Sequence, residues 1–341
     1  MILKREKLLS KLNILNKAYS QKTPMPILQF LKIDDDKLLL SNTSTAIECA
    51  IESTGLYILL PFKHLFDILN KLNGDDIELI QDGNKIKLKC GRSRFTLNCG
   101  TYDDYPNIAI LNDVDGITIN SKTFTDAVSK VNFACAKTEK RPILTGVNFT
   151  DDFIVATDSF KLAQYTDRIG LNCTITYNDI NNLISILKDI DQVVVRNNGN
   201  VASFEFGDVI YQTRLLDGKY PDTTKLIKVG DINFEINKKE LIDAIDRVCI
   251  FNQDNYNVIK LNINNNQLIV TNTASQVGDA QEYIDCVCNQ ELEIACNGEY
   301  LLECLNKFNN ETITLNIVSP ERPFTIIENK LTALILPVKV A

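Results

Sequence analysis

Residues 141–165 hold the most distinctive group of side chains that could do chemistry in this sequence. An apolar run over 143–149 is followed by a second run over 153–156, a Thr-Asp-Ser turn at 157–159 and then Lys161. Apolar runs separated by small polar residues are typical of paired strands joined by a turn. The segment therefore predicts a hairpin that offers an apolar platform beside a lysine ammonium.

Catalytic chemistry has little support elsewhere in the chain. The only histidine is His64, which argues against a histidine-dependent triad and against most zinc sites. No glycine-rich nucleotide-binding loop is present. Cys286 and Cys288 alternate on an expected strand, where packing is the simpler interpretation, and the acidic runs 34–36 and 103–104 are typical of solvated turns. An enzyme, the alternative from another functional class, is therefore disfavoured, and we expect no cofactor and no metal.

The composition is that of an ordinary globular protein with an acidic balance. The chain has 341 residues, of which 45% are hydrophobic and 23% charged, enough for two or three domains with their own cores. Its formal net charge of −8 argues against a protein that grips nucleic acid over its whole surface. A local basic face remains compatible with this charge.

Targeting signals are not evident in the sequence. No apolar run approaches the roughly 18 residues that a membrane helix needs, and residues 1–7 lack the apolar core of a signal peptide. Ten cysteines are scattered along the chain, which favours reduced thiols in a cytosolic protein. We therefore expect a cytoplasmic protein without membrane partners.

One short stretch reverses the overall acidic balance. Residues 1–22 contain six basic side chains and a single acidic one, Glu6. Such a segment either forms a solvated helix face or presents positive charge to an anionic partner. The sequence of this stretch leaves both interpretations open.

The elements that must position these groups recur along the chain. Apolar residues at the first, fifth and eighth positions, the spacing of one helix face, occur in three segments about 117 residues apart: 8–15, 124–131 and 241–248. Ser121 and Asn237 are plausible N-caps for the second and third. A second amphipathic segment repeats at nearly the same period, over 65–72, 183–190 and 301–308. Two independent helices at one period predict an internal triplication.

The remainder of each repeat has the pattern of antiparallel strands. Hairpins are expected where alternating or apolar runs flank a turn, at 77–90, 193–206 and 313–327. Each repeat is therefore an α+β unit of two helices and a strand meander. We predict three domains, 1–115, 116–229 and 230–341.

Several motifs in these repeats resemble one known family. The pattern Arg-x-x-Leu-x-Gly-Val-x-Phe from Arg141, followed by Ala-Thr-Asp-x-x-(Lys/Arg)-Leu-Ala, resembles the middle domain of the bacterial DNA polymerase III beta subunit, the DNA sliding clamps. Arg214–Asp222, Ser275–Glu282 and the C-terminal segment Leu334–Ala341 resemble further motifs of that family in the same order. The resemblance spans all three expected domains.

The resemblance implies a fold and a function. It implies the DNA-clamp fold, with two identical chains joined head to tail in a ring around double-stranded DNA, bound without sequence preference. The expected function is that of a non-catalytic processivity factor that tethers a replicative DNA polymerase, is opened by a clamp-loader ATPase and binds other clamp-motif peptides. The alternative is a peptide-binding repeat scaffold that does not encircle DNA, which the triplication by itself allows.

A peptide groove is the principal site that the resemblance implies. It would bury the Leu and Phe anchors of short extended peptides, with Lys161 and Lys339 binding their carbonyls or acids. Carried over by position, it consists of Leu144, Thr157, Ser159, Phe160, Lys161, Leu162, Pro221, Lys225, Leu226, Leu334, Leu336, Pro337, Val338 and Lys339, with Asn297 and Tyr300 at its rim. Phe160 stands where the family commonly has His, and Lys161 where it commonly has Arg, so a shifted partner preference is expected.

Two further sites are implied. Phe95 on a first-domain edge strand would meet Ile250 and Phe251 of the other chain in the dimer contact. A set of basic residues on or beside the helices would face the DNA without reading its sequence: Lys4, Lys7, Lys11, Lys22, Lys122, Lys137, Arg141, Lys238 and Lys239.

Overall fold

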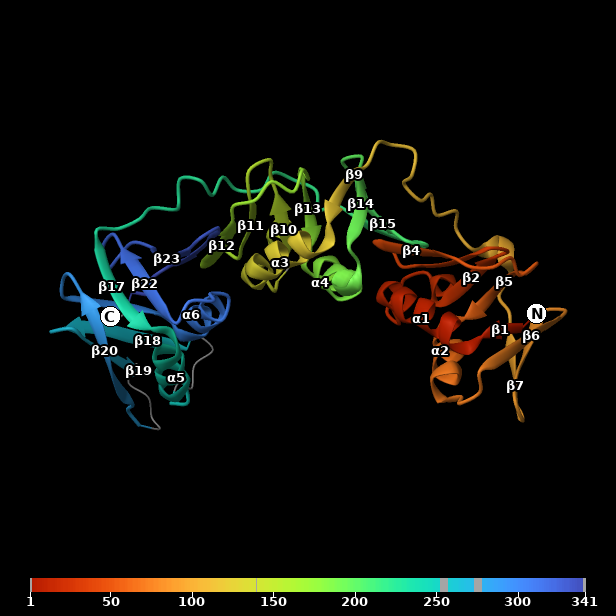
Figure 1. The fold of residues 1–341 in the computed structure, drawn as a ribbon, viewed down its shortest axis with the longest axis horizontal. Coiled ribbons are helices and arrows are strands. Elements are labelled where there is room, and N and C mark those ends of the chain that lie inside the picture. The colour runs from red at the N-terminus through yellow and green to blue at the C-terminus, as the bar shows by residue number, and fades with distance from the viewer. Residues whose placement is uncertain (1, 139, 252–256, 273–277, 340–341) are drawn as a thin grey trace. The chain divides into compact units, whose positions relative to one another are not determined.

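The computed structural model, drawn in Figure 1, describes residues 2–138, 140–251, 257–272 and 278–339. The chain divides into two compact units. The first unit comprises Met1–Thr123 with Asn181–Leu215, and the second comprises Phe124–Ile180 with Leu216–Ala341.

The first unit contains two antiparallel sheets. The smaller has the order β1-β6-β7-β8, formed by β1 (Ile2–Lys4), β6 (Asp76–Asp82), β7 (Lys85–Cys90) and β8 (Ser93–Asn98). The larger has the order β5-β2-β3-β4-β16-β15-β14-β9, formed by β5 (Tyr57–Pro61), β2 (Phe30–Asp34), β3 (Lys37–Ser41), β4 (Thr45–Ala50), β16 (Val209–Arg214), β15 (Val201–Phe206), β14 (Gln192–Asn197) and β9 (Ile117–Asn120).

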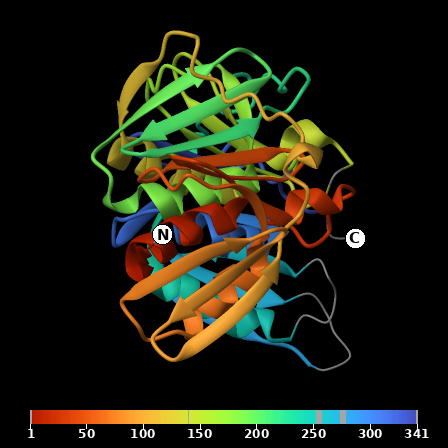
Figure 2. The same ribbon diagram turned by 90° about the vertical axis from the view of Figure 1, so that its right-hand side faces the viewer.

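Helices pack against these sheets. They are α1 (Arg5–Leu15) and α2 (Phe62–Lys71), with the short 3₁₀ turns η1 (Asn16–Ala18), η2 (Pro26–Gln29), η3 (Tyr102–Asp104) and η6 (Leu187–Asp189). Figure 2 shows β6, β7 and β8 of the smaller sheet in orange, facing the viewer, with the red helix α1 beside them. Leu8, Leu12 and Leu15 of α1 are buried at the spacing expected from the sequence.

The second unit contains one long antiparallel sheet. Its order is β13-β10-β11-β12-β24-β23-β22-β17-β20-β19-β18-β21. The strands are β13 (Cys173–Thr176), β10 (Gly146–Phe149), β11 (Ile154–Thr157), β12 (Lys161–Tyr165), β24 (Leu331–Ile335), β23 (Phe324–Glu328), β22 (Thr312–Ile317), β17 (Ile232–Asn237), β20 (Gln281–Cys288), β19 (Gln267–Asn272), β18 (Val258–Asn264) and β21 (Leu292–Asn297).

The helices of the second unit cover a large apolar core. They are α5 (Lys238–Cys249) and α6 (Gly298–Leu305), with η4 (Asn132–Ala134) and η5 (Pro142–Thr145). Leu241, Ile245 and Val248 of α5 and Leu301 of α6 are fully buried against strands of the sheet. Asn237 caps α5, because its side-chain oxygen accepts a hydrogen bond from the Glu240 amide, which confirms the expected cap.

Two helices, α3 (Ser121–Val131) and α4 (Tyr177–Ile186), have residues in both units. The cap expected for α3 is corrected by one position. Asn120, not Ser121, accepts a hydrogen bond from the Thr123 amide, at 2.9 Å, while Ser121 is the first helical residue and is buried.

The threefold repeat is confirmed, as the pairs α1/α2, α3/α4 and α5/α6 follow in order, each with its strands. Pairing between strands of different repeats explains why the three repeats form two compact units and not three. β4 of the first repeat pairs with β16 of the second, and β12 of the second pairs with β24 of the third. The middle repeat therefore shares one sheet with each neighbour, and the expected boundaries near 115 and 229 stay a prediction.

The expected hairpins are present with small adjustments. β6 and β7 pair around Gly83, whose φ of 59° suits the turn. In the 141–165 segment, the paired strands are β10, β11 and β12, but residues 142–145 form the turn η5. Pro142 stands at the start of that turn, where its fixed φ is favourable and its missing amide hydrogen costs nothing.

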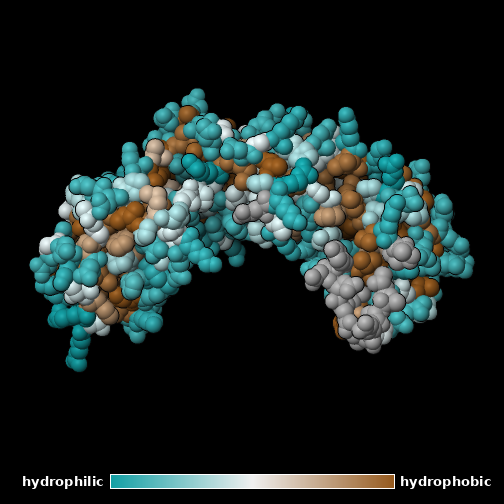
Figure 3. Space-filling model, turned by 180° about the vertical axis from the view of Figure 1, so that it is seen from behind, coloured by the Kyte–Doolittle hydropathy of each residue, from teal (hydrophilic) through white to brown (hydrophobic). Residues whose placement is uncertain are grey.

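Hydrophilic side chains cover most of the face drawn in Figure 3, where hydrophobic residues form separate patches. No helix among the described residues is long and apolar enough to cross a membrane.

Candidate functional site

The pairing of β12 with β24 brings two distant parts of the sequence together in the second unit. Leu162 lies opposite Leu334 in this antiparallel pair. Both are buried and form one apolar cluster with Val155, against which Tyr220 and Ile227 pack. These side chains pack on one another and form a buried floor, which is not itself exposed to a ligand.

Above this floor the same segments expose large apolar side chains. The exposed fractions are 59% for Phe160, 51% for Leu226, and 37% for both Leu336 and Val338. Main-chain hydrogen bonds fix the C-terminal segment beside the 157–161 turn, since the Leu336 amide donates to the Phe160 carbonyl at 2.9 Å. The Val338 amide donates to the carbonyl of Ala295 at 2.8 Å. Exposed apolar groups held on a rigid backbone are well suited to bind apolar anchors of another chain.

The 157–161 turn is held by its own polar side chains. Asp158 Oδ1 accepts hydrogen bonds from the amides of Phe160, at 2.8 Å, and Lys161, at 2.9 Å. Thr157 Oγ1 donates to the Lys161 carbonyl at 2.7 Å, and the Thr157 amide donates to the Tyr220 hydroxyl at 3.0 Å. Ser159 adopts a φ of 81°, a left-handed conformation that favours glycine. The turn that presents Phe160 is therefore rigid and includes one strained residue.

Lys161 has a different role from the expected direct contact with a ligand. Its side chain is only 1% exposed, and its Nζ lies 2.6 Å from Glu303 Oε2 and 3.3 Å from Asp158 Oδ2. The ammonium also lies 4.2 Å from the centre of the Tyr300 ring. Burial by itself lowers the pKa of Lys161, but the hydrogen bond to Glu303 and the charge of Asp158 outweigh burial and raise that pKa. All the charge of Lys161 is thus used inside the protein.

Glu303 links this buried lysine to an exposed one. Its Oε1 lies 3.3 Å from Nζ of Lys137, whose side chain is 73% exposed. One carboxylate on α6 therefore neutralises two lysines, and it ties the start of β12 to helix α6.

Tyr300 and Asn297, the two residues expected at the rim of the groove, differ in how far they are buried. Tyr300 is half-buried, and its ring centre lies 6.5 Å from that of Phe160; burial, followed by the charge of Asp158, raises its pKa. In place of a rim position, Asn297 has a buried side chain that caps α6 by accepting a hydrogen bond from the Tyr300 amide at 3.0 Å. Its polarity serves the helix terminus, which needs an acceptor for an unpaired amide.

The other groove residues divide by exposure. Leu144 and Thr157 are buried, Pro221 and Pro337 are half-buried, and Ser159, Lys225 and Lys339 are exposed. Pro337 forms an isolated bridge with Cys296, which fixes the C-terminal segment against β21. Of the lysines expected in the groove, Lys225 and Lys339 are exposed to solvent, whereas Lys161 is buried.

The residues expected at a dimer contact lie on open surfaces of their own units. Phe95 is half-buried on β8, the last strand of the four-stranded sheet, and β8 pairs only with β7 among the described residues. Ile250, after the end of α5, is 77% exposed. Phe251 is half-buried, with its ring close to Gly278.

The basic residues expected to face DNA are less uniform than their sequence suggests. Four of them have partners inside their own unit: Lys4 with Asp76, Lys11 with Asp208, Lys137 with Glu303, and Lys238 with the Phe308 carbonyl. Arg141 lies at the limit of hydrogen bonding to Ser159 Oγ, at 3.5 Å, and Lys122 is exposed. Lys7, Lys22 and Lys239 are exposed and make no ion pair within the described residues.

The described residues contain no group of three His, Cys, Asp or Glu side chains that could hold a metal ion. Residues 275–277, which begin the Ser275–Glu282 motif, lie outside the described residues, as do the last two residues of the C-terminal motif.

Sequence reasoning missed several residues of this site. Glu303, Asp158 and Tyr220 hold the groove turn through Lys161 and Thr157, and Glu303 is 142 residues away from Lys161 in the chain. In the sequence of α6, Glu303 occupies a polar position of an amphipathic helix, and acidic residues are common at such solvent-facing positions. No local signal could have identified its partner.

Comparisons with known proteins cover nearly the whole chain. Residues 1–109, 118–222 and 228–339 match, respectively, the N-terminal, central and C-terminal domains of the DNA polymerase III beta subunit. Proteins named beta sliding clamp from Staphylococcus epidermidis and Staphylococcus aureus are 29% and 28% identical, over 99% of this chain and 98% of theirs. The crystal structure of the DNA polymerase sliding clamp from Bacillus subtilis is 26% identical, with a TM-score of 0.91, covering 100% of this chain and 99% of that one.

Proposed function

The chain belongs to the family of the DNA polymerase III beta subunit, the bacterial beta sliding clamps, and we propose that its own exposed apolar and basic residues perform the function of that family. It is a DNA sliding clamp, a non-catalytic protein of DNA replication that binds DNA, the polymerase and the clamp loader. Its effect is topological, because a polymerase tethered to an encircling protein stays at high effective concentration near the primer end.

We infer that exposed apolar residues form the partner groove of this clamp. The observation that carries this proposal is the set Phe160, Leu226, Leu336 and Val338, which stand exposed above the buried floor of Leu162 and Leu334. An extended peptide with Leu and Phe anchors would bury these side chains, and a few such anchors supply most of the affinity. Acidic groups of the peptide would meet Lys225 or Lys339, since Lys161 is already neutralised by Glu303.

Two copies of the chain would close the ring. In this proposal Phe95 on the free edge of β8 meets Ile250 and Phe251 of the second copy. A head-to-tail contact of this kind gives a closed assembly when its rotation closes, and an open filament otherwise. Ile250 is 77% exposed and is therefore accessible to a second copy of the chain.

DNA would be held loosely by charge in the centre of this ring. The exposed Lys22 and Lys239 supply positive charge on a chain whose formal charge is −8. Phosphate contacts without base contacts allow binding that does not depend on sequence, and therefore allow sliding. We place the protein in the cytoplasm, where bacterial DNA is replicated.

A topological assay tests the encircling of DNA. The protein is loaded onto nicked circular DNA by a clamp-loader ATPase, and the DNA-bound fraction is measured by gel filtration before and after the circle is cut once. A ring is retained on the circle and is released when the DNA becomes linear. Equal retention on both forms would instead favour a peptide-binding scaffold that associates with DNA without encircling it.

A further inference from the structure

Strand β1 leaves one of its edges unpaired in the first unit. It is the first strand of the four-stranded sheet, and β6 is its only neighbour among the described strands. The Arg5 amide donates to the Asp75 carbonyl at 2.8 Å. Because hydrogen-bonded and non-hydrogen-bonded pairs alternate along antiparallel strands, the main-chain groups of Ile2 and Lys4 point away from β6.

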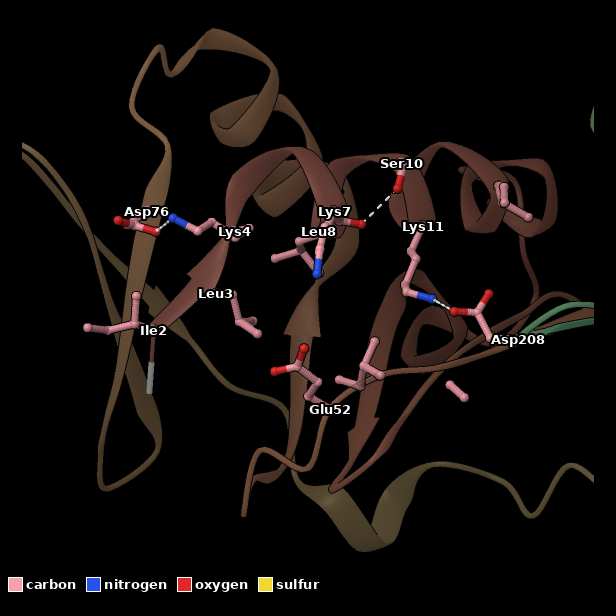
Figure 4. Close-up of a pocket in the computed structure, with 13 residues that line it drawn as sticks. Ile2, Leu3, Lys4, Lys7, Leu8, Ser10, Lys11, Glu52, Asp76 and Asp208 are labelled. Carbon is pink, nitrogen blue, oxygen red and sulfur yellow. Dashed lines mark hydrogen bonds and ion pairs between the residues drawn. The ribbon is translucent and has the colours of Figure 1, made fainter.

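A cleft lies along this free edge (Figure 4). It has a volume of about 940 Å³, within the range of ligand-binding sites in proteins. Its walls are β1 and α1 on one side and residues 50–52, at the end of β4, on the other. The Lys4 carbonyl belongs to the first turn of α1 as the N-cap carbonyl. The Ile2 amide, the Ile2 carbonyl and the Lys4 amide are therefore left to face the cleft.

The bottom of the cleft is apolar and continues into a small hollow. Leu3, Leu8 and Ile51 line both the cleft and the hollow beneath it, whose other lining residues include Leu31 and Leu79. Figure 4 shows Leu3 and Leu8 pointing toward the same space. An apolar side chain that enters here would leave water and contact a preformed apolar surface.

The charges around the cleft are nearly all neutralised in pairs. Lys4 lies 2.7 Å from Asp76, and Lys11 is paired with Asp208. Lys7, by contrast, makes no ion pair within the described residues, and its ammonium points from α1 into the cleft in Figure 4. Glu52, which also lines the cleft, makes no ion pair within the described residues either. A bound molecule would therefore place a carboxylate near Lys7 and keep it away from Glu52.

From these features we propose that the cleft beside β1 binds an extended peptide segment of another protein as an added strand. The peptide pairs its main chain with Ile2 and Lys4, buries one apolar side chain over Leu3 and Leu8, and places a neighbouring acidic side chain at Lys7. The site lies in the first unit and uses none of the groove residues, so the inference stands independently of the proposed partner groove.

The lining favours a peptide over nucleic acid. Three lysines and three carboxylates line the cleft, so their formal charges cancel and a phosphate backbone gains no net attraction there. Main-chain donors and acceptors along an open strand are recognised by another extended backbone, with specificity from side chains on alternate positions. A single acid in an otherwise neutral peptide satisfies Lys7 without approaching all three carboxylates.

The test uses the full chain with Phe160→Ala and Leu336→Ala as a background, so that groove binding does not contribute. Its binding to an immobilised library of acetylated, amidated hexapeptides is measured, with every position varied among Val, Leu, Thr, Asp and Lys. The best peptide is then labelled, and its dissociation constant is measured by fluorescence anisotropy. We expect selection of an apolar residue beside an acidic one.

Two substitutions in the cleft and one outside it decide the outcome. Ile2→Pro removes a donor that faces only the cleft, and Lys7→Ala removes the cation; each should raise the dissociation constant about five-fold or more. Lys63→Ala, which removes an equal charge from α2 outside the cleft, should leave the dissociation constant unchanged. Methylation of the peptide amides should abolish binding.

The proposal is overturned if no library peptide binds the background protein, or if neither cleft substitution weakens the selected peptide. Displacement of that peptide by a short DNA duplex at similar concentration would reassign the cleft to phosphate binding, also against the proposal.

Discussion

Replacing Glu303 with glutamine tests whether a buried ion cluster holds the groove turn in place. In the wild-type structure, Glu303 Oε2 lies 2.6 Å from Nζ of Lys161, whose side chain is 1% exposed. Glu303→Gln keeps the shape of the side chain and removes its charge. Lys161 would then keep Asp158, at 3.3 Å, and the face of the Tyr300 ring as its remaining partners.

The expected loss of stability follows from burial. Removing one partner of a buried ion pair typically costs about 3–5 kcal/mol, because the other charge is left in a poorly solvated site. Asp158 retains part of the compensation and the glutamine oxygen can still accept a hydrogen bond. We therefore expect a loss of about 2–3 kcal/mol in the free energy of unfolding. The second pair of Glu303, with the exposed Lys137, adds little, since exposed pairs contribute about 0–1 kcal/mol.

Urea denaturation followed by circular dichroism measures this loss, with a double-mutant cycle as the decisive control. Lys161→Met fills the same space without a charge, so adding it to Glu303→Gln should recover part of the lost stability. Lys137→Ala should lower the free energy of unfolding by about 0.5 kcal/mol or less. If Glu303→Gln is no more destabilising than Lys137→Ala, the assignment of a stabilising buried pair is wrong.

The pH dependence of the same variant has a definite sign. The pKa of Lys161 in the folded protein is raised above its ordinary value of 10.5. The stability contributed by the charged lysine is therefore fully present below pH 10.5, and it is lost only as the pH rises through the folded-state pKa. Between pH 6 and 9 the difference between wild type and Glu303→Gln should stay constant, and a difference that disappears within this window would contradict the argument.

Three further substitutions test the groove, the dimer contact and the strained turn. Leu336→Ala should weaken binding of a Leu- and Phe-anchored peptide by about 1–3 kcal/mol in fluorescence anisotropy, whereas Ile327→Ala, at an equally exposed position on β23, should not; equal effects would remove Leu336 from the groove. Phe95→Asp should convert a species of twice the 38.4 kDa chain mass into monomers in light scattering over a dilution series; an unchanged mass would place the contact elsewhere. Ser159→Gly should raise the free energy of unfolding by about 0.5–1 kcal/mol in urea denaturation, because the φ of 81° suits glycine; a loss would show that the serine hydroxyl outweighs the strain.

Periodic and local features of this protein were predictable from its sequence. The apolar spacing of Leu8, Leu12 and Leu15 recurs in α3 and α5, and each of these helices buries that face as expected. Hairpins with glycine or asparagine turns were also recognisable, because such turns depend on residues close together in the chain. The motifs around Thr157 and Arg214 carried the family resemblance for the same reason, since each is a short run with its own conformational preference.

Long-range partners were decided only by the tertiary structure. The sequence placed Lys161 in the groove as a cation for ligands, but folding brings Glu303 to it from 142 residues away, on helix α6. Asn297 was expected at the rim of the groove, yet its side chain is buried and caps that helix. Nor could the sequence distinguish Lys7, which points into the cleft beside β1, from Lys4 and Lys11, which are neutralised by acids on other strands and loops.

The physical reason is the range over which each interaction is specified. Helix periodicity and turn geometry depend on residues within a few positions of one another, so the amino-acid order by itself determined the repeated α+β units and the family of this chain. Charge pairing and burial depend on which segments the sheets bring together, as β12 meets β24 and β4 meets β16. Whether a given lysine is free to bind a partner is therefore decided by the tertiary structure alone.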